Sequence, residues 1–199
     1  MSGLERAKSR KPDYPIEKLF YERWSPRAFT GAAMSDEILH ALLEAARWSP
    51  SSFNEQPWRF LYARRETPAW DLFFDLLVEA NRRWAQRASL LAVVVSKKTF
   101  TKNGKPNRVH SYDAGAAWQS LALQATALGW AAHGMAGFDA DKAKRVLEIP
   151  EDYQVEAMLA VGRAADKSIL PDDLRAAEEP SGRRKIEEWS AEGKFSWPA

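Results

Sequence analysis

The sequence predicts an α+β sandwich, in which helices surround a small β-sheet. Two observations lead to this fold class. Stretches with helical periodicity alternate with short apolar stretches of strand length over residues 14–161. Residues 164–199 carry little apolar periodicity and read as an extension. With 199 residues, the chain is long enough for one sizeable core. We therefore expect a mobile arm over residues 1–12 and a single domain over residues 13–199.

The first half of the domain predicts three helices and one strand. A short helix over residues 14–22 comes first. Ser35 can cap a second helix, because the apolar residues that follow it fall on one face. This helix ends before Pro50. A strand over residues 59–63 and a third helix over residues 67–80 complete this half.

The second half contains a long helix rich in small residues. Gly115 lies inside this helix, where glycine costs about 1 kcal/mol relative to alanine. Close approach of another backbone or helix would give a reason for it. In chain order we expect a strand over residues 90–95, a polar loop over 97–107, the long helix over 111–128, a strand with a Gly-rich turn over 130–138, a short helix capped by Asp139, and a strand over 153–161.

Composition narrows the class of protein. Hydrophobic residues make up 45% and charged residues 28%, as in ordinary soluble domains. The net charge of +2, with basic and acidic residues interspersed, gives no reason to expect nucleic acid as a partner. No apolar stretch approaches the roughly 20 residues that span a bilayer. The chain has no cysteine, and its three histidines lack metal-ligand spacing, so we expect no metal site and a cytoplasmic protein.

The most informative motif is the loop of residues 50–58, Pro-Ser-Ser-Phe-Asn-Glu-Gln-Pro-Trp, between a predicted helix and a predicted strand. Its two prolines stiffen the backbone, while its hydroxyl and amide side chains both donate and accept hydrogen bonds. It contains no evident pair of nucleophile and base. We interpret it as a binding loop for a flat, polar ligand, with no catalytic side chain of its own.

This loop resembles the PSSxNxQPW segment of the nitroreductase family of FMN-dependent oxidoreductases. Three further segments resemble the same family in the same order. Residues 23–29, Arg-Trp-Ser-Pro-Arg-Ala-Phe, resemble RxSxRxF. Residues 113–121 resemble the DxGxAxQNLxL helix, with Ser120 where the family usually has Asn. A basic run, residues 181–185, comes near the C-terminus. The four segments together cover most of the chain.

The resemblance implies a nitroreductase-like sandwich with a central, mostly antiparallel sheet flanked by helices. It further implies an intertwined homodimer with a long central helix, in which the C-terminal extension, about residues 164–199, wraps around the partner subunit. FMN would bind at the dimer interface. NAD(P)H would deliver a hydride to flavin N5, and a small electrophilic acceptor, such as a nitroaromatic or a quinone, would then enter the same cleft in a ping-pong mechanism.

The resemblance also assigns roles to individual residues. Arg23 and Ser25 would bind the FMN phosphate together with the C-terminal arginines, and Arg27 would lie beside the pyrimidine edge of the flavin. A main-chain N–H of the Gly-rich turn would face N5, and flavin itself would be the only catalytic group. The full cofactor-binding set implied is Arg23, Trp24, Ser25 and Arg27, then Pro50, Ser51, Ser52, Asn54 and Gln56 from the other subunit, then Met135, Ala136 and Gly137, and finally Arg183 and Arg184.

Two alternatives stay open from the sequence alone. One is an enzyme of the same fold with a dedicated substrate, such as an enal reductase, a reductive dehalogenase or an oxygen-using enzyme that fragments flavin. The other is a non-catalytic FMN-binding dimer, which uses the long helix only for association. Fold alone does not choose between them. The acceptor, and the preference for NADH or NADPH, cannot be derived from these residues.

Overall fold

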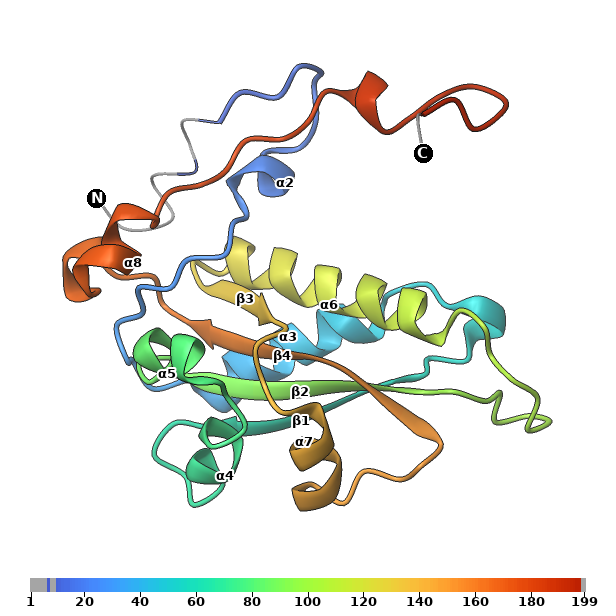
Figure 1. Cartoon of the computed structure of the whole chain (residues 1–199), viewed down its shortest axis with the longest axis horizontal. Coiled ribbons are helices and arrows are strands. Elements are labelled where there is room, and N and C mark those ends of the chain that lie inside the picture. The colour runs from blue at the N-terminus through green and yellow to red at the C-terminus, as the bar shows by residue number, and fades with distance from the viewer. Residues whose placement is uncertain (1–6, 8–9, 198–199) are drawn as a thin grey trace.

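A four-stranded antiparallel sheet forms the centre of the molecule in the computed structural model, which describes residue 7 and residues 10–197 (Figure 1). The strand order is β1-β2-β4-β3, so β2 and β4 are the inner strands. Every residue of β2 except the last is buried, which matches the continuous apolar stretch predicted there. The bounds are β1 Trp58–Arg64, β2 Leu90–Lys97, β3 Ala131–Met135 and β4 Tyr153–Gly162.

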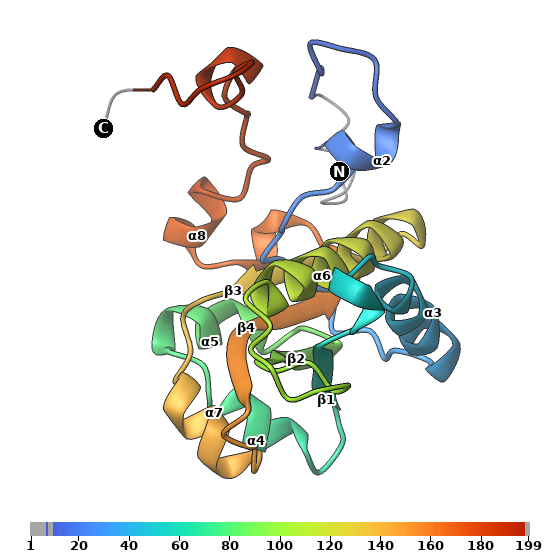
Figure 2. The same ribbon diagram turned by 90° about the vertical axis from the view of Figure 1, so that its right-hand side faces the viewer.

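Helices cover both faces of the sheet, as Figure 2 shows. Side chains of β2 alternate between two apolar cores. Leu91, Val93 and Val95 face the core under α4 (Trp70–Phe74), α5 (Glu79–Ala85) and α7 (Ala140–Val146). Leu90, Ala92 and Val94 face the core under α3 (Asp36–Arg47) and α6 (His110–Ala127). The α+β sandwich predicted from the sequence is therefore confirmed.

Local capping explains where the predicted helices begin and end. The Ser35 hydroxyl accepts a hydrogen bond from the Ile38 N–H at 3.3 Å and so caps α3. The Asp139 carboxylate caps α7 in the same way, accepting from the Lys142 N–H at 2.8 Å. Gly129, with φ of +72°, ends α6 in the left-handed conformation that glycine adopts most easily.

The helix predicted over residues 67–80 is divided in the structure. Residues 75–78 leave the helical path between α4 and α5 because they pair with the turn that follows β3. Leu77 forms an isolated antiparallel bridge with Phe138, and the Val78 N–H donates to the Gly137 carbonyl at 3.1 Å. A tertiary contact thus overrides a continuous helical pattern.

Two segments outside the sandwich lie side by side. The short helix α2 (Lys18–Glu22), within the predicted 14–22 helix, packs on α6. The C-terminal segment runs back past it through η2 (Lys167–Ile169), α8 (Asp172–Ala176) and η3 (Ile186–Glu188), as Figure 1 shows. Most of the predicted N-terminal arm falls outside the described residues. No helix in the described part of the chain is both long and apolar enough to cross a membrane.

Candidate functional site

Three arginines from distant parts of the chain gather beside α2, and we call them the cationic region: Arg10, Arg23 and Arg183. The Arg10 guanidinium donates to the carbonyl oxygens of Tyr21 at 3.2 Å and Arg23 at 2.9 Å. It therefore satisfies carbonyls that the end of α2 leaves without helical partners. The Arg23 side chain in turn lies 3.4 Å from the Ser25 hydroxyl. Arg10 was not among the residues predicted from the sequence.

Electrostatics in the cationic region favours an anion. Burial lowers the pKa of Arg23, and the nearby charge of Arg183 lowers it further. Burial and the charges of Arg183 and Arg23 likewise lower the pKa of Arg10. Within the described residues, none of the three guanidinium groups forms an ion pair with a carboxylate, and the Arg10 Nε is buried without a hydrogen-bond partner. Forked, permanently charged donors in this arrangement suit a phosphate.

Arg27, four residues after Arg23, is fixed by a buried carboxylate. Its guanidinium lies 3.6 Å from Oε2 of Glu178, which comes from the C-terminal segment. Oε1 of Glu178 accepts hydrogen bonds from the N–H groups of Arg27 at 2.7 Å and Ala28 at 2.9 Å. Nothing in the local sequence singles out Glu178 among the neighbouring acidic residues, so sequence reasoning missed it.

His133, on β3, holds the backbone of residues 23–29 in place. Its Nδ1 donates to the Pro26 carbonyl at 3.0 Å, and its ring packs 4.6 Å from that of Trp84. Burial, helped by the charge of Arg27, lowers the pKa of His133 to about 4, although the hydrogen bond to Pro26 acts in the opposite direction. His133 is therefore neutral near pH 7 and acts as a hydrogen-bond donor to the backbone of residues 23–29.

The remaining residues predicted around this region differ in exposure. Trp24 is buried within the chain, and Ser25 is half-buried. Arg183 and Arg184 are exposed, and the Arg183 guanidinium donates to the Gly182 carbonyl at 2.8 Å. The structure thus brings Arg23, Ser25 and Arg183 together, whereas among the described residues no hydrogen bond or ion pair joins Arg184 to a side chain.

The second predicted set, residues 50–57, which we call the polar loop, has an unusual backbone. Phe53, Asn54 and Gln56 have φ of 52°, 55° and 50°, so three non-glycine residues lie in the left-handed region. Such residues cost about 1 kcal/mol or more each and cluster at functional sites. Glu55, the one position between Asn54 and Gln56, has ordinary helical backbone angles, with φ of −65° and ψ of −30°. A ligand-binding loop is a reason to keep this conformation.

Hydrogen bonds hold the polar loop in place. The Ser52 N–H donates to the carboxylate of Asp113, a buried residue at the start of α6, at 3.0 Å. The Ser51 hydroxyl accepts from the Gln56 N–H at 3.0 Å. The Gln56 amide donates to Asn54 Oδ1 at 3.0 Å, within the loop itself. Pro50, Phe53 and Asn54 are exposed, Ser51, Ser52 and Gln56 are half-buried, and Pro57 is buried.

A hollow of about 510 Å³ lies next to the polar loop. Glu55 connects the loop to it, because its Oε1 accepts from the Thr101 N–H at 2.9 Å. Phe53 and Phe100 meet edge to face at 5.8 Å, and Phe53 is otherwise exposed. The loop predicted over residues 97–107 therefore borders the polar loop of residues 50–57. The hollow between the two loops is lined by Phe53, Glu55, Phe100, Lys102, Asn103, Lys105 and Pro106.

The third predicted set lies in the turn between β3 and α7. Met135 is buried, Ala136 is exposed and Gly137 is half-buried. The Gly137 carbonyl accepts from the Asn81 side chain at 2.9 Å. A Cβ added at Gly137 would come within 2.7 Å of that side chain, so only glycine fits without a shift. Asn81, from α5, was missed because its contact partner is distant in sequence.

The polar loop lies beyond the N-terminal end of α6, whereas α2, beside which the cationic region gathers, lies over the C-terminal half of α6, as Figure 1 shows. The polar loop is bonded to Asp113 in the first turn of α6. The segment that continues from Arg23 reaches the end of β4, where the Thr30 N–H donates to the Arg163 carbonyl. An α-helix of 18 residues is about 27 Å long. One chain therefore does not bring both sets around one small ligand.

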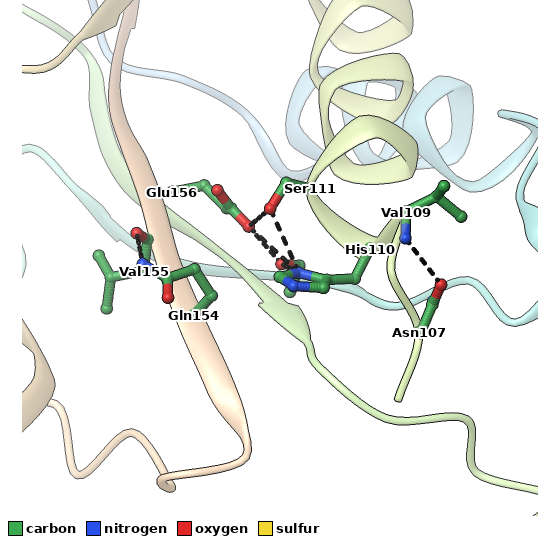
Figure 3. Close-up of polar contacts among 8 residues, drawn as sticks. Asn107, Val109, His110, Ser111, Gln154, Val155 and Glu156 are labelled. Carbon is green, nitrogen blue, oxygen red and sulfur yellow. Dashed lines mark hydrogen bonds and ion pairs between the residues drawn. The ribbon is translucent and has the colours of Figure 1, made fainter. Parts of the chain in front are cut away.

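A polar cluster at the N-terminus of α6 combines a histidine, two serines and a glutamate (Figure 3). Ser111 donates to Glu156 Oε1 at 2.7 Å, and Ser96 donates to the same oxygen. His110 Nδ1 lies 2.6 Å from the Ser96 hydroxyl. Serine and carboxylate both approach the same ring nitrogen, whereas a triad needs them on opposite nitrogens. This cluster is therefore not arranged for nucleophilic catalysis.

Comparisons with known proteins agree with these features. A model of the nitroreductase family matches residues 21–163. "Protein DrgA" of Synechocystis is 28% identical over 173 residues, covering 73% of this chain and 82% of that protein. A protein of Archaeoglobus fulgidus named "Putative NADH dehydrogenase/NAD(P)H nitroreductase" is 26% identical over 159 residues, covering 75% of this chain and 86% of its own.

Solved structures share the fold over nearly the whole chain. One, described as an oxidoreductase containing FMN, is 48% identical and covers 94% of this chain and 96% of its own, with a TM-score of 0.90. Another, from Desulfovibrio desulfuricans and in complex with FMN, is 28% identical and covers 93% of this chain and all of its own, with a TM-score of 0.71.

Proposed function

The chain belongs to the nitroreductase family, and we propose that it is an FMN-dependent oxidoreductase that uses NAD(P)H to reduce a small electrophilic acceptor. Four sequence segments in family order, and two similar structures whose descriptions include FMN, support this proposal. The single observation that carries it is the cationic region, since three guanidinium groups converge there and the pKa values of Arg10 and Arg23 are lowered.

The cationic region fits the phosphate of FMN. A phosphate dianion would relieve the repulsion between Arg23 and Arg183 and would offer oxygens to several forked donors. The Ser25 hydroxyl, beside Arg23, adds a neutral donor. Arg10 holds the backbone carbonyl of Arg23 and so keeps this side chain at the site. These residues would anchor the cofactor and take no part in bond-making.

The other two sets would orient the flat part of the cofactor. FMN, when bound, supplies hydride transfer between a nicotinamide nucleotide and an acceptor. Arg27 would place a positive charge beside the pyrimidine edge, where the reduced ring carries negative charge. Main-chain N–H groups of the turn at Ala136 and Gly137 would face the ring. No side chain is proposed as catalytic acid or base.

We propose that two copies of the chain form each site. Because the cationic region lies beside α2, over the C-terminal half of α6, and the polar loop lies beyond its N-terminal end, a second copy packed along this helix would bring the polar loop of one to the cationic region of the other (Figure 1). Exposed aromatics flank this path, including Trp48, Phe53 and Tyr112. Gly115 is also open, with nothing within 4 Å of an added Cβ, which leaves room for close approach of a partner helix.

Nicotinamide nucleotide and acceptor would then use one open cleft in turn, as in a ping-pong mechanism. The hollow between the polar loop and residues 100–106 is a candidate entrance, because Glu55 fixes its rim to the polar loop. The C-terminal segment would wrap around the partner, burying Trp189 and Phe195, which are 59% and 79% exposed in one chain.

The visible absorption spectrum of the purified protein, before and after anaerobic NADH or NADPH, tests this function. A two-band flavin spectrum that bleaches with either nucleotide is the expected result, and an acceptor screen under nitrogen would follow. A protein that stays colourless and does not bind added FMN would contradict the proposal. A bound flavin that neither nucleotide reduces would leave only a flavin-binding protein.

A further inference from the structure

Glu178 differs in burial from the rest of the C-terminal segment that contains it. Along residues 171–197, all of which the structure describes, it alone is buried, and only 1% of its surface is exposed. Its neighbours are mostly polar and exposed. A carboxylate in the interior is costly unless it is paired and hydrogen-bonded. Contacts in the interior must therefore compensate for the burial of this one carboxylate.

The reason lies in the contacts of its two oxygens. Oε1 accepts from two consecutive N–H groups, those of Arg27 and Ala28, at 2.7 and 2.9 Å. Oε2 lies 3.6 Å from the guanidinium of Arg27. One carboxylate thus fixes both the backbone and the side chain of Arg27. This clamp also ties the C-terminal segment down five residues before Arg183, which joins the cationic region.

We propose that Glu178 is a positioning residue that holds Arg27 at the flavin and sets how much positive charge the flavin experiences. The inference rests on the proposed function. Arg27 alone would strongly favour the reduced flavin, whereas the carboxylate of Glu178 neutralises part of that charge. Glu178 consequently lowers the reduction potential of the bound flavin and keeps it a better electron donor to the acceptor.

The decisive measurement is the two-electron midpoint potential of FMN bound to E178Q. The glutamine carbonyl can replace Oε1 as acceptor for both N–H groups, so the variant removes charge while keeping the clamp. We expect the reduced flavin to bind about tenfold more tightly relative to the oxidised flavin than in wild type, which converts to a potential about 30 mV more positive. FMN affinity in the oxidised state should change by less than about threefold.

E179Q is the matched control. Glu179 is the next residue, is exposed, and pairs with Lys167 at the surface, so the variant makes the same change in net charge without touching Arg27. Its potential should equal that of wild type. Equal potentials in E178Q, E179Q and wild type would overturn the proposal.

A double variant separates charge tuning from a general effect on folding. In R27Q/E178Q the buried carboxylate and its cation are both absent, so the glutamine at 178 should no longer shift the potential relative to R27Q alone. A full shift in the R27Q background would mean that Glu178 acts on the flavin without Arg27, which contradicts a positioning role.

Amide hydrogen exchange distinguishes this inference from the proposed function. The N–H groups of Arg27 and Ala28 should exchange slowly in wild type and E179A, and at least about tenfold faster in E178A. A wild-type protein that does not bind FMN would refute the function but leave this clamp to be judged by exchange alone. Unchanged exchange in E178A would refute the clamp, whatever the cofactor.

Discussion

The cationic region takes its three arginines from both ends of the chain, whereas the polar loop takes all its ligand-facing residues from one short stretch. The first is charged and partly buried, with Arg10 holding the Arg23 carbonyl, while His133 and Glu178 hold the adjacent residues 26–28. The second carries a single charge, that of Glu55, and is held by its own left-handed backbone, by a bond to Asp113 and by the bond from the Thr101 N–H to Glu55. Under the proposed function, this difference means that the phosphate end of the ligand would be recognised by charge gathered through folding, and the ring end by local conformation.

Among the variants that test this contrast, R23Q should have the largest effect. Loss of a charge-assisted phosphate contact should weaken FMN binding about 10- to 100-fold. Riboflavin, which has no phosphate, should bind within about threefold of wild type. Titration of apoprotein with both ligands, followed by flavin fluorescence, measures the two affinities. R145Q, at an exposed arginine on α7, is the control. Equal losses for FMN and riboflavin would remove the phosphate role from Arg23.

Acid sensitivity should belong to the stretch of residues 23–29, which carries Arg23 and Arg27, through His133. Its pKa in the folded protein is about 4, below the ordinary value of 6.5, so the unfolded chain takes up a proton first as pH falls. This contribution to stability is complete above pH 6.5 and is lost between pH 6.5 and 4. We expect a loss of about 2 kcal/mol or less between pH 7.5 and pH 5.

H133N tests that expectation. Asparagine keeps a donor for the Pro26 carbonyl but does not titrate in this range. Urea unfolding at pH 7.5 and pH 5 should show a smaller acid loss in the variant than in wild type. If both lose the same free energy of unfolding, the acid sensitivity comes from other groups.

The polar loop should respond differently from the cationic region. D113A removes the acceptor of the Ser52 N–H, a bond worth about 1 kcal/mol. Because the loop is proposed to contact the ring and not the phosphate, FMN and riboflavin should weaken equally, by about five- to tenfold. D141A, at an exposed aspartate in the first turn of α7, should change neither affinity. A selective loss of FMN would place the loop near the phosphate instead.

The smallest effect is expected from a substitution on α6, between the cationic region and the polar loop. Ser120 accepts a hydrogen bond from the Ser49 hydroxyl at 2.7 Å, on the face of α6 that packs against the end of α3. S120A should lower the free energy of unfolding by about 1 kcal/mol. FMN affinity should stay within about twofold of wild type. A larger loss of affinity would mean that α6 transmits strain to the sites.

Much of the fold could be predicted because its determinants are local. Ser35 and Asp139 cap helices by bonds to residues three positions later, and β2 is long enough and apolar enough to be recognised as an inner strand. The split between α4 and α5 could not be predicted, since the bridge from Leu77 to Phe138 joins residues far apart in sequence.

The candidate site divides in the same way. Residues 50–56 and Arg23, Ser25 and Arg27 stand in motifs that resemble those of the family, and this resemblance pointed to them. Glu178 carries no motif, and its meaning depends on which of several acidic residues the fold buries. Arg10 lies before any recognisable pattern. Supporting residues of this kind emerge only when the chain is folded, because their partners are backbone groups elsewhere.

The separation of the two regions along α6 has a consequence for mixtures of two variant chains. If each site takes its cationic region from one chain and its polar loop from the other, R23Q and D113A damage different halves of a shared site. In a mixed pair, one site would carry both lesions and the other would carry neither. Co-refolding equal amounts of the two variant chains would then restore about a quarter of all sites to wild-type affinity by random pairing. Two defective proteins would thus complement each other in one tube.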